Sequence, residues 1–172
     1  YNCLLSEIFF LKILKKIILT MIFSLILITS TSYVFAQMGS TTHIEDPIVV
    51  LETKQGEIII EFFHIDAPNH VQNFILLTEN KDFDGILFHR IIPGFMIQSG
   101  DPNTIDGDPN TWGQGGKGIL SDRIDAEFNN IQHDRGIVSM ARSSDPNSAG
   151  SQFFIVHKDS TFLDGEYTVF GR

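Results

Sequence analysis

Residues 88–101 read FHRIIPGFMIQSGD, and the expected fold is built outward from this stretch. Apolar runs from Leu87 to Ile92 and from Phe95 to Ser99 flank the pair Pro93-Gly94. Short apolar runs on either side of a Pro-Gly pair are typical of two strands joined by a turn. Because strand side chains alternate between two faces, Arg90 and its neighbours are expected to divide between an interior and a surface groove.

Strands are also expected on both sides of this stretch. Upstream, a β-hairpin is predicted by the runs Ile48 to Leu51 and Glu57 to Phe62, which flank a turn at Lys54-Gln55-Gly56. Downstream, three further strands are predicted over Gly136 to Arg142, Gln152 to His157 and Tyr167 to Arg172.

A single helix is expected between the hairpin and the central stretch. Asp66 or Ala67 would cap it, Pro68 suits its first turn, and Asp84-Gly85 would break it. Helical spacing is shown by Val71, Phe74, Ile75 and Thr78. Residues 101–118 are rich in Gly, Asp, Asn and Pro and are expected to form a long loop. Many short strands with one helix predict a mainly β fold, either a barrel or a sandwich with a helical plug.

The N-terminal part of the chain has a composition of its own. Basic residues at Lys12, Lys15 and Lys16 precede an apolar run, and a short stretch of small and polar residues ends at Ala36. This order is typical of a secretory signal peptide cut after Ala36, so export is expected. The alternative is an uncleaved membrane anchor over residues 17–36, since about 20 apolar residues can span a bilayer.

Three parts follow from these features: residues 1–36 as signal peptide or anchor, residues 37–47 as a linker, and residues 48–172 as the folded domain. Residues 37–172 carry 9 Lys and Arg against 20 Asp and Glu, a net charge of −11. Such a surface repels phosphate backbones and anionic lipid, so nucleic acid is not an expected partner. Membrane contact is expected only through an uncleaved N-terminal segment.

Several familiar motifs are absent. Counting from Asp106, the sixth and twelfth positions of a calcium loop hold Thr111 and Lys117 instead of Gly and Glu. The six histidines show no zinc-ligand spacing, and no Gly-x-Ser-x-Gly elbow of a serine hydrolase occurs. The only cysteine is Cys3, which excludes a disulfide in the exported part. Neither a metal nor a cofactor is expected.

Two long segments together resemble the cyclophilins, a family of peptidyl-prolyl cis/trans isomerases. The first is the stretch at residues 88–101, and the second joins Ser139 to Arg142 with Gly150 to Ile155. A weaker third match runs from Phe162 to Gly171. The resemblance implies a closed antiparallel β-barrel, with eight strands when complete and with flanking helices. The family barrel continues with a helix and a closing strand, which are expected to be missing after Arg172.

The resemblance also implies the residues of a substrate groove. Catalytic roles are expected for Arg90, Gln98 and Phe95. Substrate binding is expected from Met96, Ala141, Arg142, Gln152, Phe154, Phe162, Leu163, Tyr167 and His89, with His89 as a supporting hydrogen-bonding residue. Without the resemblance, Phe and Met in strands are more often core residues, and an isolated Arg is more often solvated. An apolar pocket with a few polar groups would nevertheless suit a proline ring.

The chemistry expected of Arg90 is non-covalent. The barrier to rotation about an Xaa-Pro bond, about 18–20 kcal/mol, is the loss of amide resonance. A donor aimed at the proline nitrogen favours the twisted state, and a guanidinium can supply it because it stays charged. The expected activity is therefore isomerisation of proline-containing peptides and unfolded extracytoplasmic clients. The alternative is a proline-peptide binding module or holdase without turnover, against which the presence of Arg90 argues.

Three positions depart from many eukaryotic cyclophilins and look like the bacterial or archaeal type. Phe162 stands in place of Trp, Tyr167 in place of His, and Arg142 in place of Asn. These departures leave isomerase activity as the expectation, but they imply that cyclosporin binds weakly.

Overall fold

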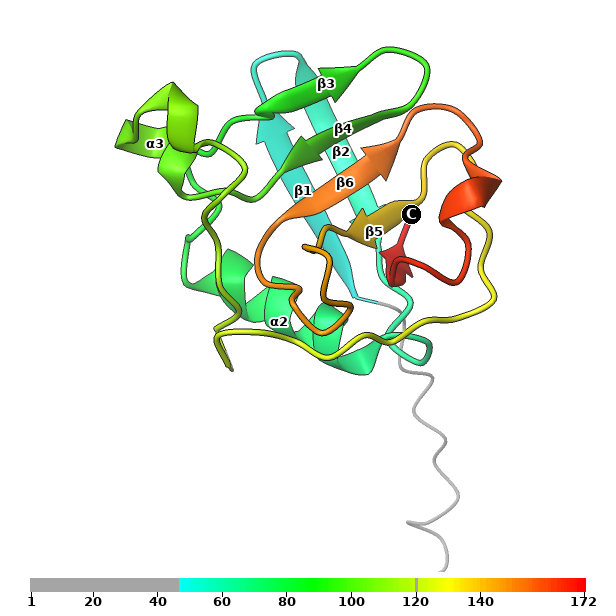
Figure 1. Ribbon diagram of the computed structural model, residues 1–172. Coiled ribbons are helices and arrows are strands. Elements are labelled where there is room, and N and C mark those ends of the chain that lie inside the picture. The colour runs from blue at the N-terminus through cyan, green and yellow to red at the C-terminus, as the bar shows by residue number, and fades with distance from the viewer. Residues whose placement is uncertain (1–46, 120) are drawn as a thin grey trace, which may run out of the picture. The chain divides into compact units, whose positions relative to one another are not determined.

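The computed structural model describes residues 47–119 and 121–172 (Figure 1). In chain order its elements are β1 (Ile48–Thr53), β2 (Gly56–Glu61), α2 (Pro68–Glu79), β3 (Arg90–Ile92), β4 (Met96–Ser99), α3 (Asn103–Asp106), the 3-10 turn η1 (Pro109–Thr111), β5 (Val138–Met140), β6 (Phe153–Val156), the 3-10 turn η2 (Thr161–Leu163) and β7 (Val169–Gly171). The predicted signal peptide or anchor lies outside the described residues. No helix within the described ranges is long and apolar enough to cross a membrane.

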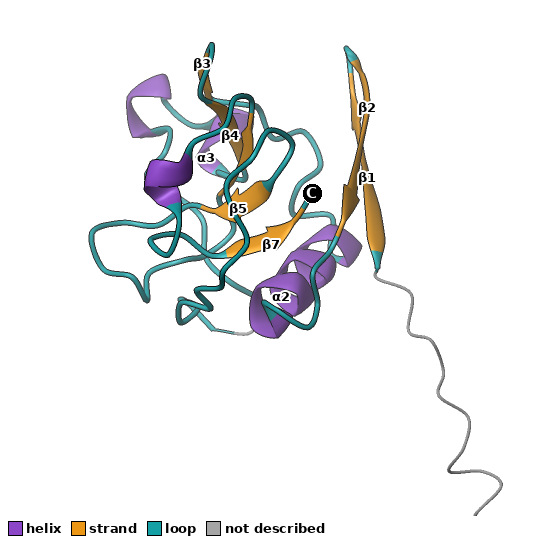
Figure 2. Ribbon diagram, turned by 90° about the vertical axis from the view of Figure 1, so that its right-hand side faces the viewer, coloured by secondary structure: helices purple, strands orange, loops and turns teal. Residues whose placement is uncertain are grey.

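The strands form two antiparallel sheets. β1 and β2 make the predicted hairpin, and a five-stranded sheet has the order β3-β4-β6-β5-β7. Figure 2 shows the hairpin beside this sheet, with α2 at one end of both. Two backbone hydrogen bonds of 2.9 Å between Glu61 and Arg172 connect the end of β2 to the end of β7. The strand order is therefore β1-β2-β7-β5-β6-β4-β3.

The fold is mainly β, as predicted, but the closed barrel, expected to have eight strands when complete, is not confirmed by the described residues. They form seven strands, and no ladder between β1 and β3 is found among them. The strand positions agree with the prediction, although most strands are shorter than the apolar runs that predicted them.

The helix α2 begins as expected and ends early. Ala67 is its N-cap and Pro68 its first residue, where the missing N–H of proline costs nothing. It ends at Glu79, and the predicted break at Asp84-Gly85 lies beyond a turn in which Lys81 has φ 65°. The predicted loop at residues 101–118 also differs, because it contains the short helix α3 and the turn η1.

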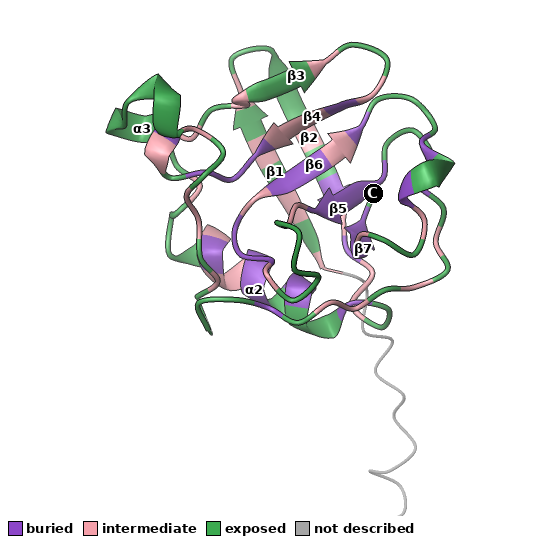
Figure 3. Cartoon of the chain, in the orientation of Figure 1, coloured by how far each residue is buried: buried purple, intermediate pink, exposed green. Residues whose placement is uncertain are grey.

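Strand alternation divides the apolar residues of the five-stranded sheet between two faces. Phe153 points to a cluster under α2, here called the helix-side core, and Phe154 points to a second cluster, here called the pocket-side core. The helix-side core contains Ile60, Phe62, Ala67, Val71, Phe74, Ile124, Val138, Met140, Ala149, Phe153 and Phe170. The pocket-side core contains Met96, Ile137, Phe154, Val156, Leu163 and Val169. Figure 3 shows the buried residues along β5, β6 and β7 and on one side of α2.

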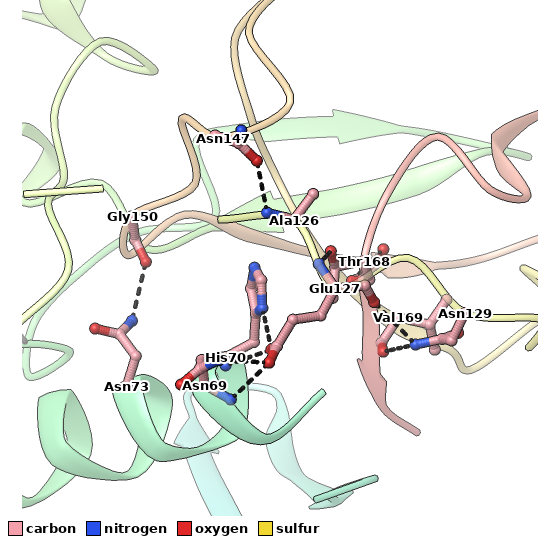
Figure 4. Close-up of polar contacts among 11 residues, drawn as sticks. Asn69, His70, Asn73, Ala126, Glu127, Asn129, Asn147, Gly150, Thr168 and Val169 are labelled. Atoms are coloured by element: carbon pink, nitrogen blue, oxygen red, sulfur yellow. Dashed lines mark hydrogen bonds and ion pairs between the residues drawn. The ribbon is translucent and has the colours of Figure 1, made fainter. Parts of the chain in front are cut away.

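A polar seam closes the helix-side core. The carboxylate of Glu127 accepts the backbone N–H groups of Asn69 and His70, each at 3.0 Å, at the start of α2 (Figure 4). It also lies 2.6 Å from Nδ1 of His70, whose side chain is fully buried. Asn73, one turn further on, donates to the carbonyl of Gly150 at 3.0 Å. The two backbone bonds to Glu127 satisfy N–H groups that the first turn of a helix leaves open.

Candidate active site

A row of side chains crosses one face of the five-stranded sheet. Arg90 on β3 lies opposite Gln98 on β4, and Gln98 lies opposite Phe154 on β6. Phe154 in turn lies opposite Ser139 on β5. Directly paired residues share a face, so strand register alone places the guanidinium, the amide and the aromatic ring side by side. The row begins at exposed Arg90 and ends at fully buried Ser139.

A chain of hydrogen bonds holds the polar end of this row. Nη1 of Arg90 donates to Oε1 of Gln98 at 3.3 Å, and Nε2 of Gln98 donates to Oε1 of Gln152 at 2.8 Å. Nε2 of Gln152 then donates to the carbonyl of Gly115 at 2.6 Å. Each amide thus accepts from one neighbour and donates to the next, which fixes both amide orientations. A guanidinium has five N–H donors, so Arg90 retains donors for a ligand.

A cavity of about 140 Å³ opens beside this chain. It is lined by Arg90, Phe95, Met96, Gln98, Ala141, Arg142, Phe154, Leu163 and Tyr167. All nine lining residues belong to the twelve predicted site residues. Its floor comes from the pocket-side core, in which Met96, Phe154 and Leu163 are at most 7% exposed. An apolar floor with a cation and an amide at one side suits a small apolar ring that carries an amide group.

The other three predicted residues lie around this cavity in different ways. Gln152 lines a neighbouring cavity and supports Gln98. Phe162 is 71% exposed, and its ring packs beside Phe95 with 5.5 Å between the ring centroids. His89 lines neither cavity. The structure therefore brings eleven of the twelve residues to one region, whereas His89 does not line either cavity.

The supporting hydrogen bond expected of His89 is not found. Neither ring nitrogen has a hydrogen-bond partner within the described part of the chain, although both are buried. Burial lowers the pKa of His89, and this outweighs the opposing influence of the charge on Asp101 and of the Leu87 backbone. Burial is the largest of these causes, so this environment favours the neutral imidazole.

A second cavity, of about 490 Å³, was missed by the sequence analysis. It shares Gln98, Ala141 and Arg142 with the first, so the two are adjacent. Its remaining lining is Gly113, Gln114, Gly115, Gly116, Lys117, Asp122, Arg123, Ser143, Ser148, Gly150, Ser151 and Gln152. The available signal was the run of glycines from Gly113 to Gly118, because residues without side chains let loops approach and leave space.

Two glycines bring the walls of the second cavity together. Gly100 has φ +89° and Gly116 has φ +98°, a conformation that residues with a Cβ rarely adopt. A Cβ on Gly100 would collide with the backbone of Ser151, and one on Gly116 with the Ser151 hydroxyl. Both glycines are therefore required for the contact that places Gly115 against Gln152.

Asp101 anchors the same loop from inside. Its carboxylate is fully buried and accepts the backbone N–H groups of Asn103, Gly113 and Gly115. The oxygens of this carboxylate therefore already have backbone partners. No cluster of three or more potential metal-ligating side chains occurs within the described ranges.

Arg142 forms the partition between the two cavities. Its Nε donates to the carbonyl of Glu166 at 2.9 Å, and its Nη1 donates to the carbonyl of Ser143 at 2.9 Å. The guanidinium carbon lies 4.7 Å from the centre of the Tyr167 ring, a cation–π geometry. A planar group held on three sides is a firm wall, which a shorter Asn at this position would not provide.

Comparisons with known proteins agree with this geometry. The family model described as cyclophilin type peptidyl-prolyl cis-trans isomerase/CLD matches residues 48–172. A peptidyl-prolyl cis-trans isomerase of Synechococcus elongatus is 44% identical over 123 residues, covering 72% of this chain and 77% of that protein. The isomerase ppi1 of Schizosaccharomyces pombe is 42% identical over 126 residues, covering 72% and 76%.

A solved structure is similar as well. A cyclophilin type peptidyl-prolyl cis-trans isomerase of Cryptosporidium parvum, crystallised in the presence of the dipeptide Ala-Pro, matches with a TM-score of 0.66 and 36% identity. The match covers 73% of this chain and 77% of that one. The row from Arg90 to Phe154 and these relatives lead to one conclusion: the chain belongs to the cyclophilin family of peptidyl-prolyl cis/trans isomerases.

Proposed function

We propose that this isomerase acts on Xaa-Pro bonds of exported proteins, with the proline ring in the 140 Å³ cavity and Arg90 as the donor to the proline nitrogen. In the twisted transition state the lone pair of that nitrogen is localised and accepts a hydrogen bond more strongly. Arg90 is held at the cavity by Gln98, so little reorientation is needed when the bond rotates.

The single observation that carries this proposal is the position of Arg90. It lies on the same sheet face as Phe154, separated only by Gln98, so the guanidinium lies next to the apolar part of the small cavity. The Cryptosporidium relative was crystallised with Ala-Pro, a ligand of the size that such a cavity would take. The residues that precede proline in a client would run toward the 490 Å³ cavity across Arg142.

The proposed place of action rests on the N-terminal residues. Their basic start, apolar run and small residues before Gln37 support export of the domain. Unfolded clients outside the cytoplasm are then the expected substrates, since slow Xaa-Pro isomerisation delays folding there as elsewhere.

Two assays on the wild-type protein and Arg90→Ala test the enzymatic part. Turnover of a proline peptide and its equilibrium binding are measured side by side. We expect kcat/KM to fall by about 10²-fold or more in Arg90→Ala, as for loss of one transition-state donor. Arg135→Ala, which changes an exposed arginine lining neither cavity, is the control and should match wild type. Binding without turnover in the wild type would instead establish a proline-peptide binding module.

Protein recovered from outside the cytoplasm tests the place of action. N-terminal sequencing should begin at Gln37, directly after the predicted cleavage at Ala36. An intact segment of residues 17–36 in the membrane fraction would show an anchor instead.

A further inference from the structure

A second hydrogen-bond chain, buried except at Asp164, lies beneath the proposed proline site. Nδ1 of His133 is 2.8 Å from Oδ1 of Asp164, and Nε2 of His133 is 3.1 Å from the hydroxyl of Ser139. That hydroxyl lies 2.8 Å from the carbonyl of Thr168, to which it can donate. The side chains of His133 and Ser139 are both completely buried.

The order of these groups is that of a hydrolytic triad, but their burial gives them another use. Ser139 has no exposed surface, so its hydroxyl cannot reach a substrate. Asp164 accepts two bonds from one residue, because the backbone N–H of His133 also donates to it at 2.8 Å. The side-chain bond from His133 is the main cause that lowers the pKa of Asp164, so its carboxylate stays ionised. Asp164 and His133 thus form a fixed link between two loops.

Each anchor of this link adjoins a residue that lines the small cavity. Asp164 directly follows Leu163, and Thr168 directly follows Tyr167. The ring of His133 stacks on Phe154, with 6.2 Å between centroids and 14° between planes. Phe154, Leu163 and Tyr167 all line the cavity. The His133 chain contacts the first of them and bonds to the residues that directly follow the other two.

We propose that Asp164 and His133 are positioning residues which set the width of the proline cavity and thereby its selectivity for a five-membered ring. This inference rests on the proposed use of that cavity for proline. The link holds the Leu163 wall at a fixed distance from Phe154, whereas η2 is otherwise a short 3-10 turn whose Phe162 is largely exposed. If Leu163 could move away from Phe154, the cavity would accept a ring larger than that of proline.

The test compares two peptides that differ by one methylene. One contains proline and the other its six-membered homologue, pipecolate, at the same position. A pocket that fits its ligand closely discriminates against one extra methylene by about tenfold or more in kcat/KM. In Asp164→Ala we expect this preference to shrink to about threefold or less, with a rise in KM for the proline peptide and a nearly unchanged kcat.

Two further variants separate positioning from general stability. Asp164→Asn keeps an oxygen that can accept from His133, so it should restore most of the ring preference. Asp159→Ala removes a neighbouring exposed carboxylate, which accepts the backbone N–H of Arg135 at 2.9 Å and lines neither cavity. This control should leave the preference unchanged, and thermal melts establish that each variant is folded.

The outcomes are distinct. Equal losses on both peptides in Asp164→Ala, with an unchanged preference, would overturn the positioning role. A wild type that turns over neither peptide would contradict the proposed catalytic site. The ratio of the two dissociation constants, measured by calorimetry, would in that case still decide whether Asp164 controls ring size.

Discussion

His70 and His133 are two fully buried histidines in opposite cores, and their hydrogen bonds differ in one respect. Both place Nδ1 against a carboxylate oxygen, at 2.6 Å from Glu127 for His70 and at 2.8 Å from Asp164 for His133. Nε2 of His133 has the hydroxyl of Ser139 at 3.1 Å, whereas Nε2 of His70 has no partner among the described residues.

This difference separates the tasks of the two cores. The hydrogen bonding of His70 ends at its own ring. The residue connects the start of α2 to the loop at Glu127, and its Nε2 passes no hydrogen bond on to another described group (Figure 4). His133 is a connector, which continues the hydrogen bonding toward strands that line the cavity. We therefore expect changes in the helix-side core to alter stability, and changes on the pocket side to alter activity. Four predictions test this division.

The largest effect is expected for Phe74→Ala in the helix-side core. The Phe74 ring lies within 5.5 Å of the rings of Phe62, Phe83, Phe153 and Phe170, measured between centroids. Its removal should cost about 3–5 kcal/mol in the free energy of unfolding, measured by urea titration. The kcat/KM per folded molecule should stay near wild type. A loss of activity greater than the unfolded fraction would break the division between the cores.

The next effect is expected for Gln152→Leu on the pocket side. This change leaves the carbonyl of Gly115 and the amide of Gln98 without their partner, so Gln98 no longer holds Arg90 firmly. The kcat/KM for a proline peptide should fall about tenfold, the equivalent of one lost hydrogen bond. Gln72→Leu, at an exposed position of α2, is the matched control. Equal kinetics in the two variants would show that the amide chain is not needed.

A smaller effect is expected in the pH dependence of stability. Burial lowers the pKa of His70 below its ordinary 6.5, despite the opposing bond and charge of Glu127. The unfolded chain therefore binds a proton that the folded protein resists, and the free energy of unfolding falls as pH drops below about 6.5. Burial raises the pKa of Glu127, but bonds from His70 and Asn69 outweigh this and lower it, so a further loss follows below its ordinary 4.5.

His70→Gln isolates the first of these losses. The amide can still donate to Glu127 but does not titrate, so unfolding measured between pH 7 and 5 should show a flatter slope than wild type. The difference reports the shift at about 1.4 kcal/mol per pKa unit. Glu127→Gln removes the charge that opposes burial at His70, so its slope between pH 7 and 5 should be at least as steep as that of wild type, while the decline below 4.5 is lost. Identical slopes for wild type and His70→Gln would show that titration of His70 does not cause the loss of stability below pH 6.5.

The smallest effect concerns cyclosporin at the exposed Phe162. This ring packs on Phe95 beside the small cavity but has no N–H to donate. Weak inhibition is expected, and Phe162→Trp should strengthen binding by about 0.5–1.5 kcal/mol, the net value of one hydrogen bond. Inhibition constants from the proline-isomerisation assay measure it. Equal constants for the two proteins would exclude a missing donor as the cause.

The sequence by itself determined the local elements and most of the small cavity. Turn signals and two-residue alternation identified the hairpin and the short strands, and Pro68 identified the start of α2, because these signals act between near neighbours. The three segments that resemble the cyclophilins, including the weaker match from Phe162 to Gly171, contain every residue that lines the 140 Å³ cavity. The end of α2 and the short helices after Asp101 were missed, since weak local signals compete there with loop contacts.

Only the tertiary structure decided which distant segments meet. Periodicity shows that a run is a strand but not which strand it pairs with, so the pairing of β4 with β6 had no local signal. The glycines between Gly113 and Gly118 were a signal for close loop packing, but not for which residues would complete the 490 Å³ cavity. The two buried histidines find carboxylates 57 and 31 residues away along the chain. Such bonds form because a buried polar group needs a partner, and the partner is whichever group the packed strands bring within reach.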